Sequence, residues 1–323
     1  MRDAYGRPID YMRVSVTDRC NLRCVYCMPE DLPFIPHESI LRYEEILRIC
    51  SVAAKTGIKH IKVTGGEPLV RKGCTGLVRE LKRVPGIEHV TMTTNAVLLQ
   101  TYLGELAEIG LDGLNVSLDS LDPGVYSQIT GKDSLDAALG SLRAATGSGL
   151  KLKINCVPLA GLNEDGIIPI SKLALTDKID VRYIELMPDD ANGGVKGLAS
   201  SEILERLAAE YPDLKPNAAK RGFGPARYYK TAMLTGSIGL IDAVSHRFCS
   251  ACNRLRLTSE GFLKLCLFHD EGVDLRALLR NGASDSILET AFAEAVYSKP
   301  VSYFHGGGPD GMNKISTMSR IGG

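Results

Sequence analysis

Three cysteines fall within eight positions near the start of the chain, at Cys20, Cys24 and Cys27. Gaps of three and two residues let a short loop place three thiolates around one metal centre, which is one ligand short of a closed four-ligand site. A cubane iron–sulfur cluster held in this way would keep one iron open to a chelating small molecule. Two other interpretations remain open on spacing alone: a zinc site completed by His37, and a redox pair formed by Cys24 and Cys27.

A second group of cysteines lies in the last third of the chain, with the spacing Cys-x2-Cys-x13-Cys. Its members are Cys249, Cys252 and Cys266. With His269 added, this spacing would also suit structural zinc. Arg254 and Arg256 follow at alternating positions, so on an extended backbone they point the same way. Two guanidinium groups suit phosphate oxygens, and a structural zinc knuckle does not need them, which favours a second iron–sulfur cluster.

The elements that position these residues alternate between strand and helix. Apolar runs predict strands at 11–17, 59–63, 88–93, 113–117, 151–157 and 181–186. Helical spacing predicts helices at 43–55, 77–84, 98–109, 136–145 and 167–175. This alternation implies parallel βαβ units. A closed eight-fold barrel typically needs ~250 residues, and the alternation stops near Met187, so an open, partial barrel fits better.

The pattern changes after about residue 212, where short strands with glycine turns (226–241) replace the alternation. Two further helical stretches follow, at 275–280 and 287–297. We therefore expect an α/β protein with a partial (β/α)6 TIM-like barrel at 1–212 and a second, cluster-bearing module at 213–323.

Composition narrows the class of protein. Thirty-eight basic and 38 acidic residues give zero formal net charge, which argues against a broad nucleic-acid or membrane-binding surface. Met1–Asp10 contains no apolar signal-peptide core, and no apolar run approaches ~20 residues. The nine cysteines are clustered, which indicates metal ligation in a reducing cytoplasm over a disulfide framework.

The motifs together resemble a known family. Cys-x3-Cys-x2-Cys with Tyr26 before its last cysteine, and the Gly65–Pro68 stretch, resemble the radical S-adenosylmethionine (SAM) enzymes. The late cysteine set, the run Asn253–Arg256 and the Gly-Gly end narrow the resemblance to the GTP 3′,8-cyclase family, also called molybdenum cofactor biosynthesis protein A. A peptide-modifying radical SAM enzyme is the alternative, although such enzymes usually carry more late cysteines.

The resemblance implies a lyase that begins molybdenum cofactor biosynthesis. SAM would be cleaved to a 5′-deoxyadenosyl radical that removes hydrogen from C3′ of GTP. C3′ would then bond to C8, giving (8S)-3′,8-cyclo-7,8-dihydroguanosine 5′-triphosphate. The implied cofactors are two 4Fe–4S clusters and SAM, and the implied next enzyme is cyclic pyranopterin monophosphate synthase. The sequence specifies neither the electron donor nor whether the protein is a monomer or a homodimer.

The resemblance also assigns roles by position. The cluster ligands would be Cys20, Cys24, Cys27, Cys249, Cys252 and Cys266. SAM would be bound by Tyr26, Gly66, Ser117 and Met187. GTP would be bound by Arg13, Lys62, Thr93, Lys153, Arg254, Leu255 and Arg256. Catalysis would involve Arg182, Gly322 and Gly323. Lys62 stands where the family usually has arginine, so the charge is kept and the bidentate fork is lost. Cys50, Cys74 and Cys156 match no ligand position and are expected to be small interior residues.

Overall fold

The computed structural model describes residues 1–28, 33–187, 194–219, 221–246 and 248–302. The chain divides into two compact units, each assembled from segments that are distant in sequence. Unit 1 consists of Met1–Asn21, Asp31–Thr93 and Cys249–Gly323, and unit 2 of Leu22–Glu30 and Thr94–Phe248. The predicted boundary at residue 212 does not coincide with these units and stays a prediction.

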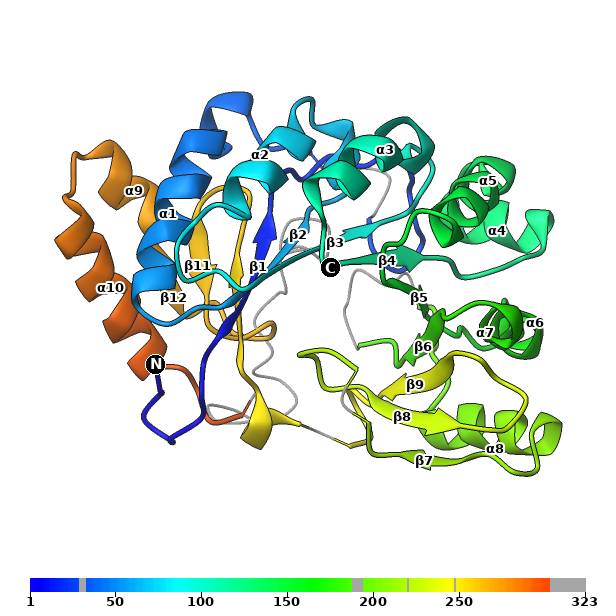
Figure 1. The fold of residues 1–323 in the computed structure, drawn as a ribbon. Helices are drawn as coiled ribbons and strands as arrows, with labels where there is room; N and C mark the ends of the chain where they lie inside the picture. The colour runs from blue at the N-terminus through cyan, green and yellow to red at the C-terminus, as the bar shows by residue number, and fades with distance from the viewer. Residues whose placement is uncertain (29–32, 188–193, 220, 247, 303–323) are drawn as a thin grey trace. The chain divides into compact units, whose positions relative to one another are not determined.

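Unit 1 is built on a sheet with the strand order β12-β11-β10-β1-β2-β3. These strands span Gly272–Asp274, Phe262–Lys264, Arg254–Leu257, Tyr11–Ser15, His60–Thr64 and His89–Thr94, respectively. β1 lies between β10 and β2 and is parallel to both, so a strand from the late part of the chain completes the early sheet. β11 and β12 continue the sheet in antiparallel fashion. The helices of unit 1 are α1 (Tyr43–Lys55), α2 (Cys74–Leu81), α9 (Leu275–Arg280) and α10 (Asp285–Tyr297), and Figure 1 shows α1 packed beside α10.

The strands of unit 1 have one apolar face and one polar face. Met12 and Val14 of β1 and Leu255 and Leu257 of β10 are fully buried on the apolar face. Helix α1 buries an amphipathic stripe that includes Ile46 and Ile49. Because side chains alternate along a strand, the remaining positions of the same strands form the opposite, polar face. That face carries most of the charged residues that the sequence singles out in this unit.

Unit 2 repeats the plan with the strand order β4-β5-β6-β9-β8-β7. These strands span Gly113–Ser117, Leu152–Cys156, Asp180–Ile184, Ser237–Ile241, Arg227–Lys230 and Lys215–Asn217, respectively. The first four are parallel, and β8 and β7 are antiparallel at the edge. Its helices are α3 (Leu99–Ile109), α4 (Pro123–Thr130), α5 (Leu135–Thr146), α6 (Ile167–Ser171), α7 (Leu173–Thr176) and α8 (Ser200–Glu210).

All six predicted strands of the first 187 residues are present, and so are four of the five predicted helices; the helix predicted at 167–175 is divided into the two short helices α6 and α7. The helix predicted at 77–84 begins earlier, at Cys74, because Gly73 adopts a left-handed conformation (φ 82°) that starts the turn there. The structure adds a helix that was not predicted, α4, whose N-terminus is capped by Asp122 and begins with Pro123. The alternation also continues past Met187, because β9 returns parallel to β6 after α8.

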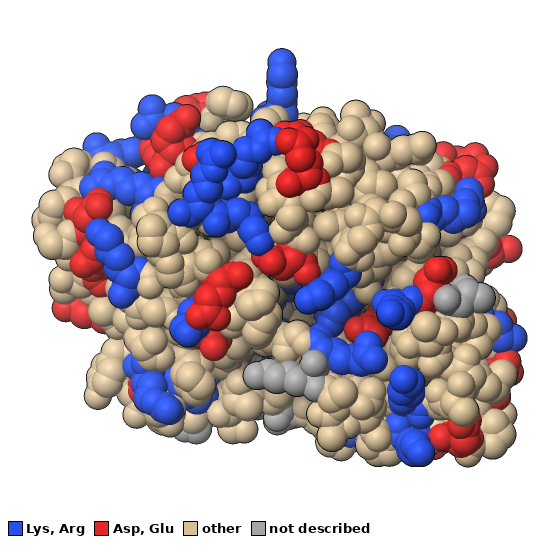
Figure 2. All heavy atoms as spheres, in the orientation of Figure 1, with Lys and Arg blue, Asp and Glu red and all other residues tan. Residues whose placement is uncertain are grey.

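Two global features agree with the composition. Basic and acidic side chains are interspersed over the face drawn in Figure 2. Among the described residues, no helix combines the length and hydropathy needed to cross a bilayer.

Candidate active site

The loop that leads to Cys20 is fixed by backbone contacts with the Gly65–Pro68 loop, all within unit 1. The Gly66 amide donates to the Thr17 carbonyl (2.7 Å), and the Glu67 amide donates to the Arg19 carbonyl (2.8 Å). A Cβ atom at Gly66 would lie 2.4 Å from the Arg19 carbonyl oxygen. Glycine is therefore required here for local packing, in addition to the SAM contact that the resemblance implies.

Cys24 and Cys27 share a tight turn at the start of unit 2. The amides of Cys27 and Met28 both donate to the Cys24 carbonyl, at 2.9 and 3.0 Å. The preceding residues are held by α4, because the amides of Arg23 and Val25 donate to carbonyls at its C-terminal end. The turn thus holds two of the three motif cysteines on an ordered backbone.

Tyr26, between these cysteines, donates its hydroxyl to Asp119 Oδ2 (2.7 Å). Asp119 follows β4, is 5% exposed, and also accepts the Val157 amide through Oδ1 (2.8 Å). Burial raises the Asp119 carboxyl pKa to about 6, against the lowering effect of its two hydrogen bonds. Burial and the nearby carboxylate raise the pKa of Tyr26 well above its ordinary value, so the hydroxyl keeps its proton and orients the ring. No motif in the sequence points to Asp119 as a partner of Tyr26.

The polar face of unit 2 brings two predicted residues, Ser117 and Arg182, into one row. Ser117, Asn155, Arg182 and Gly239 form one row across β4, β5, β6 and β9. A Cβ atom at Gly239 would lie 2.9 Å from Arg182 Cγ and 3.0 Å from the Tyr228 ring, so the glycine makes room for both side chains. Met187 follows β6 and is partly exposed.

Lys153 belongs to the neighbouring row of unit 2, opposite Asp180. Its ammonium donates to the Tyr228 hydroxyl (3.1 Å) and to the Arg221 carbonyl, and lies 3.6 Å from Asp180 Oδ2. Burial, then the positive charge of Arg182, lower the Lys153 pKa to about 8. The sequence signalled neither Arg221, Asp180 nor Tyr228, because each acts through a tertiary contact.

The second cysteine set lies entirely in unit 1, and a buried arginine holds its backbone. Arg7, 5% exposed, donates to the carbonyls of Cys249 (2.8 Å), Pro300 (2.7 Å) and Val301 (3.0 Å). The Cys252 amide closes a turn on the Cys249 carbonyl at 3.1 Å. Arg7 therefore fastens the cysteine turn to the segment that follows α10.

A second buried cation, Lys299, lowers the pKa of one of these cysteine thiols. Its ammonium donates to the carbonyls of Arg254 (3.0 Å) and Leu265, and the residue is 2% exposed. Burial alone would raise the Cys252 thiol pKa, but Lys299 and Arg254 bring it down to about 7. The thiolate is the form that ligates metal, so this environment fits an anionic iron–sulfur cluster.

The geometry of this set also tests the zinc alternative. A single tetrahedral zinc ion would draw its sulfur ligands to within ~3.8 Å of one another, given Zn–S bonds of ~2.3 Å. Among the described residues, Cys249, Cys252 and Cys266 do not form a group whose ligand atoms converge within 4.8 Å. His269 faces the Ser302 carbonyl instead, at 3.2 Å from Nε2. In the part of the chain that the structure describes, Cys249, Cys252, Cys266 and His269 therefore do not form a preorganised zinc site.

The polar face of unit 1 carries a row of cations beside this cysteine set. Arg256, Arg13 and Lys62 are register partners on β10, β1 and β2, so their side chains leave the same face. Arg256 is 9% exposed, and burial followed by the like charges of Arg13 and Arg254 holds its pKa well below the usual range. Like charges held together in this way fit a polyanionic ligand.

The remaining predicted residues fall into three groups. Thr93 lies on the polar face of β3 and is partly exposed. Leu255 is fully buried on the apolar face, so only its main chain would be available to GTP. Gly322 and Gly323 lie outside the described residues.

All nine cysteines are thiols and not half-cystines. The three assigned to the interior are buried, and burial raises the pKa of Cys50 and Cys74 to about 12. The pKa of Cys156 is likewise far above its ordinary value, with burial as its main cause. This confirms that these three pack as small apolar residues. His37, the zinc alternative's fourth ligand, is exposed in a short 3-10 helix.

Comparisons with known proteins agree with this arrangement. A model of the radical SAM superfamily matches residues 14–174, and the Molybdenum Cofactor Synthesis C model matches 179–305. A GTP 3′,8-cyclase of Heliobacterium modesticaldum is 43% identical over 100% of both chains. The chain belongs to the GTP 3′,8-cyclase family. The cyclase of Moorella thermoacetica is 42% identical, again over 100% of both chains.

Comparison with solved structures identifies the fold of this cyclase family member. SuiB of Streptococcus suis, solved with S-adenosylmethionine, superposes with a TM-score of 0.66 at 15% identity, covering 91% of this chain and 67% of SuiB. The likeness establishes the fold alone, an α/β partial TIM-like barrel of the radical SAM type, as predicted. The full-length cyclase relatives favour the cyclase branch over the peptide-modifying alternative.

Proposed function

We propose that this protein is a GTP 3′,8-cyclase, which converts GTP to (8S)-3′,8-cyclo-7,8-dihydroguanosine 5′-triphosphate at the start of molybdenum cofactor biosynthesis. The observation that carries the proposal is the row Arg13, Lys62 and Arg256 on the same unit as the second cysteine set. Binding a triphosphate requires several cations that converge on its oxygens, and the purine of the same nucleotide must be bound close to them. Unit 1 offers the cations and the thiols together.

The two cysteine sets would hold the metal groups. Cys20, Cys24 and Cys27 would ligate one 4Fe–4S cluster, and the set at 249, 252 and 266 would ligate the other. When bound, these clusters supply reductive cleavage of SAM and an open iron for the purine. The protein's own contribution is to bind, orient and shield the two substrates.

Within unit 1, the chain's own residues would orient GTP. Arg13, Lys62 and Arg256 would bind the phosphates by charge-assisted hydrogen bonds, with Thr93 adding a hydroxyl. Arg254 lies next to Cys252. Its side chain would contact GTP between the phosphates and the purine bound at the second cluster. The main chain of Leu255 would follow the same path.

Residues of unit 2 would serve SAM and the reacting sugar. Tyr26, held by Asp119, would present a fixed ring, while Ser117 and Met187 would line the adenosine and methionine parts. Lys153 and Arg182 would add positive charge for GTP, and Gly66 of unit 1 would let backbone approach the methionine amino group. Lys62 reaches a phosphate as a point charge, without the planar fork of arginine.

The last two glycines, Gly322 and Gly323, are proposed to reach the substrates and assist cyclisation. Glycine backbone enters a narrow site without a side-chain clash. Deleting both should leave iron content unchanged and reduce cyclised nucleotide per 5′-deoxyadenosine by orders of magnitude. Wild-type product yield from the shortened chain would reject this role.

The product would pass to cyclic pyranopterin monophosphate synthase in the cytoplasm, whose reducing conditions suit thiolate-held clusters. The test is anaerobic incubation with GTP, SAM and a strong reductant. We expect 5′-deoxyadenosine and the cyclised nucleotide to form together. If 5′-deoxyadenosine forms with a peptide substrate and GTP stays intact, the proposal is wrong.

A further inference from the structure

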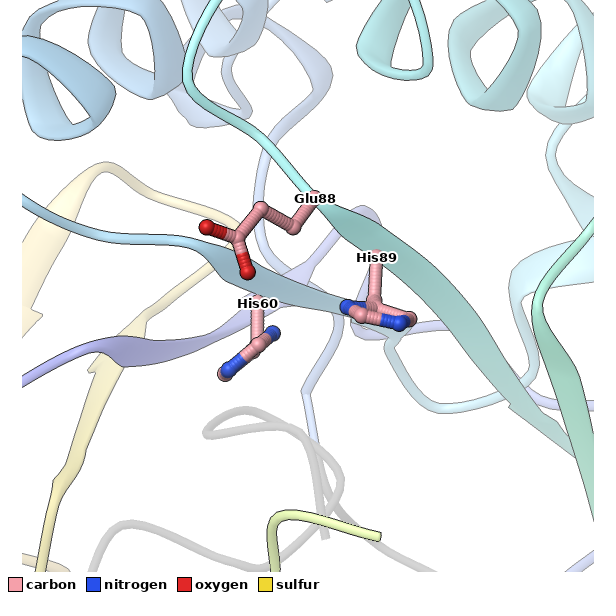
Figure 3. A group of neighbouring side chains, drawn as sticks. All are labelled: His60, Glu88 and His89. Atoms are coloured by element: carbon pink, nitrogen blue, oxygen red, sulfur yellow. The ribbon is translucent and has the colours of Figure 1, made fainter.

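A cluster of ligand-type side chains lies outside the residues discussed so far, at the start of two strands of unit 1. His60 opens β2, His89 opens β3, and Glu88 directly precedes β3. Figure 3 shows the three side chains gathered around these strand starts. One ligand atom from each residue lies within 4.8 Å of the other two. Among the described residues, no other group of three His, Cys, Asp or Glu side chains brings its ligand atoms this close together.

We propose that His60, Glu88 and His89 bind a divalent transition-metal ion, for which Zn²⁺ is the probe, and that the ion ties the start of β2 to the start of β3. Two imidazoles and one carboxylate form a donor set that zinc favours, with water as the fourth ligand. Bonds of ~2.0–2.2 Å at tetrahedral angles would place the donor atoms about 3.3–3.6 Å apart, so side-chain rotations must close roughly 1 Å to bind the ion.

The backbone holds the three residues in place before any ion binds. The amides of Glu88 and His89 both donate to the Lys59 carbonyl, at 2.8 and 3.2 Å. The amides of Lys59 and His60 both donate to the Asp10 carbonyl, at 2.8 and 3.0 Å. His60 and His89 are also register partners, and their ring centroids are 5.2 Å apart. A site on adjacent strands is therefore already organised, which lowers the entropic cost of binding.

The charges around the cluster set its affinity. Lys59 Nζ forms an ion pair with Glu88, 2.7 Å from its Oε1. The same ammonium competes with a metal ion for Glu88. Removing it should strengthen metal binding, whereas removing a ligand should weaken it.

The experiment uses anaerobic protein with both clusters loaded, dialysed against buffered Zn²⁺, with metal content and zinc X-ray absorption as readouts. We expect one additional zinc per chain with nitrogen and oxygen ligands at ~2.0–2.1 Å and no sulfur at ~2.3 Å. His60→Ala and His89→Ala should each weaken zinc binding by about tenfold or more. Lys59→Gln should tighten it. His37→Ala, at an exposed histidine of the same unit, is the matched control and should change nothing.

Stability gives a second readout. Zinc should raise the Tm of the wild type and of His37→Ala, and this rise should vanish in His60→Ala and His89→Ala, because an ion that binds only the folded state stabilises it. Iron content checks that each variant has folded. Sulfur ligands around the added zinc, or unchanged affinity in both histidine variants, would overturn the proposal. Unchanged affinity in Glu88→Gln would remove Glu88 from the site and overturn the three-ligand assignment.

Discussion

Replacing Gly66 with alanine should remove the first iron–sulfur cluster. The new Cβ would lie 2.4 Å from the Arg19 carbonyl oxygen, 2.7 Å from the Arg19 carbonyl carbon and 2.8 Å from the Asp18 oxygen. Ordinary contact begins near 3.4 Å, so the Arg19 backbone must move by about 1.0 Å. Cys20 is the next residue. Since metal–ligand distances tolerate only ~0.2 Å, a shift of this size at Cys20 is several times too large.

The assay is anaerobic iron and sulfide analysis together with the yield of 5′-deoxyadenosine. Two cubanes give about eight irons per chain, so Gly66→Ala should retain about four and lose SAM cleavage. The matched control is Gly76→Ala in α2, where a Cβ would meet nothing within 4 Å. Full iron content in Gly66→Ala would refute the packing argument. If the variant kept its iron but no longer bound SAM, the only role left for Gly66 would be its backbone contact with the methionine part of SAM.

Three further predictions concern the two units separately. Cys24→Ala should abolish SAM cleavage, whereas Cys252→Ala should keep uncoupled cleavage without cyclised product; full cleavage in both variants would reject the assigned roles. Arg254→Ala and Arg256→Ala should each weaken GTP binding about tenfold or more, and guanosine binding less, because a charge-assisted hydrogen bond contributes roughly 1.5–3 kcal/mol. Equal losses for GTP and guanosine in a binding titration would contradict phosphate recognition. Because the Lys153 pKa is lowered to about 8, its positive charge is present below pH 8 and lost above it. GTP affinity should therefore fall between pH 7 and 9 more steeply in the wild type than in Lys153→Arg, and parallel pH curves would contradict this.

The elements and the ligands could be predicted from the sequence because both follow local rules. Strands with alternating burial, such as β3, can be recognised by the two-residue period of their apolar side chains. The cysteine sets can be recognised by their spacing. The direction of Arg254 and Arg256 also followed from the alternation of an extended chain, and their shared face is confirmed by the register with β1.

The supporting residues could not be predicted, because their roles arise only through tertiary contacts. Lys299 lies in no motif, yet it helps to lower the Cys252 pKa. Arg7 reads as one cation in a polar N-terminal segment, yet it is buried against the cysteine turn. Asp119 has the same character, since only folding brings it to Tyr26. Gly66 was predicted, but the carbonyl oxygen that excludes a side chain there was not.

The parallel pairing of β1 with β10 has a consequence for how the protein is made. β1 leaves the ribosome early and finds β2 soon afterwards, but its other hydrogen-bonding edge must wait for Arg254–Leu257. Unit 2 lies between these segments and can fold while translation continues, because folding units form as they emerge. During that interval the open edge of β1 invites pairing with other nascent chains. Assembly of the second cluster on unit 1 must therefore follow translation of the final segment. If that segment is delayed or truncated, the first consequence is aggregation of the chain, and the loss of catalytic activity is secondary.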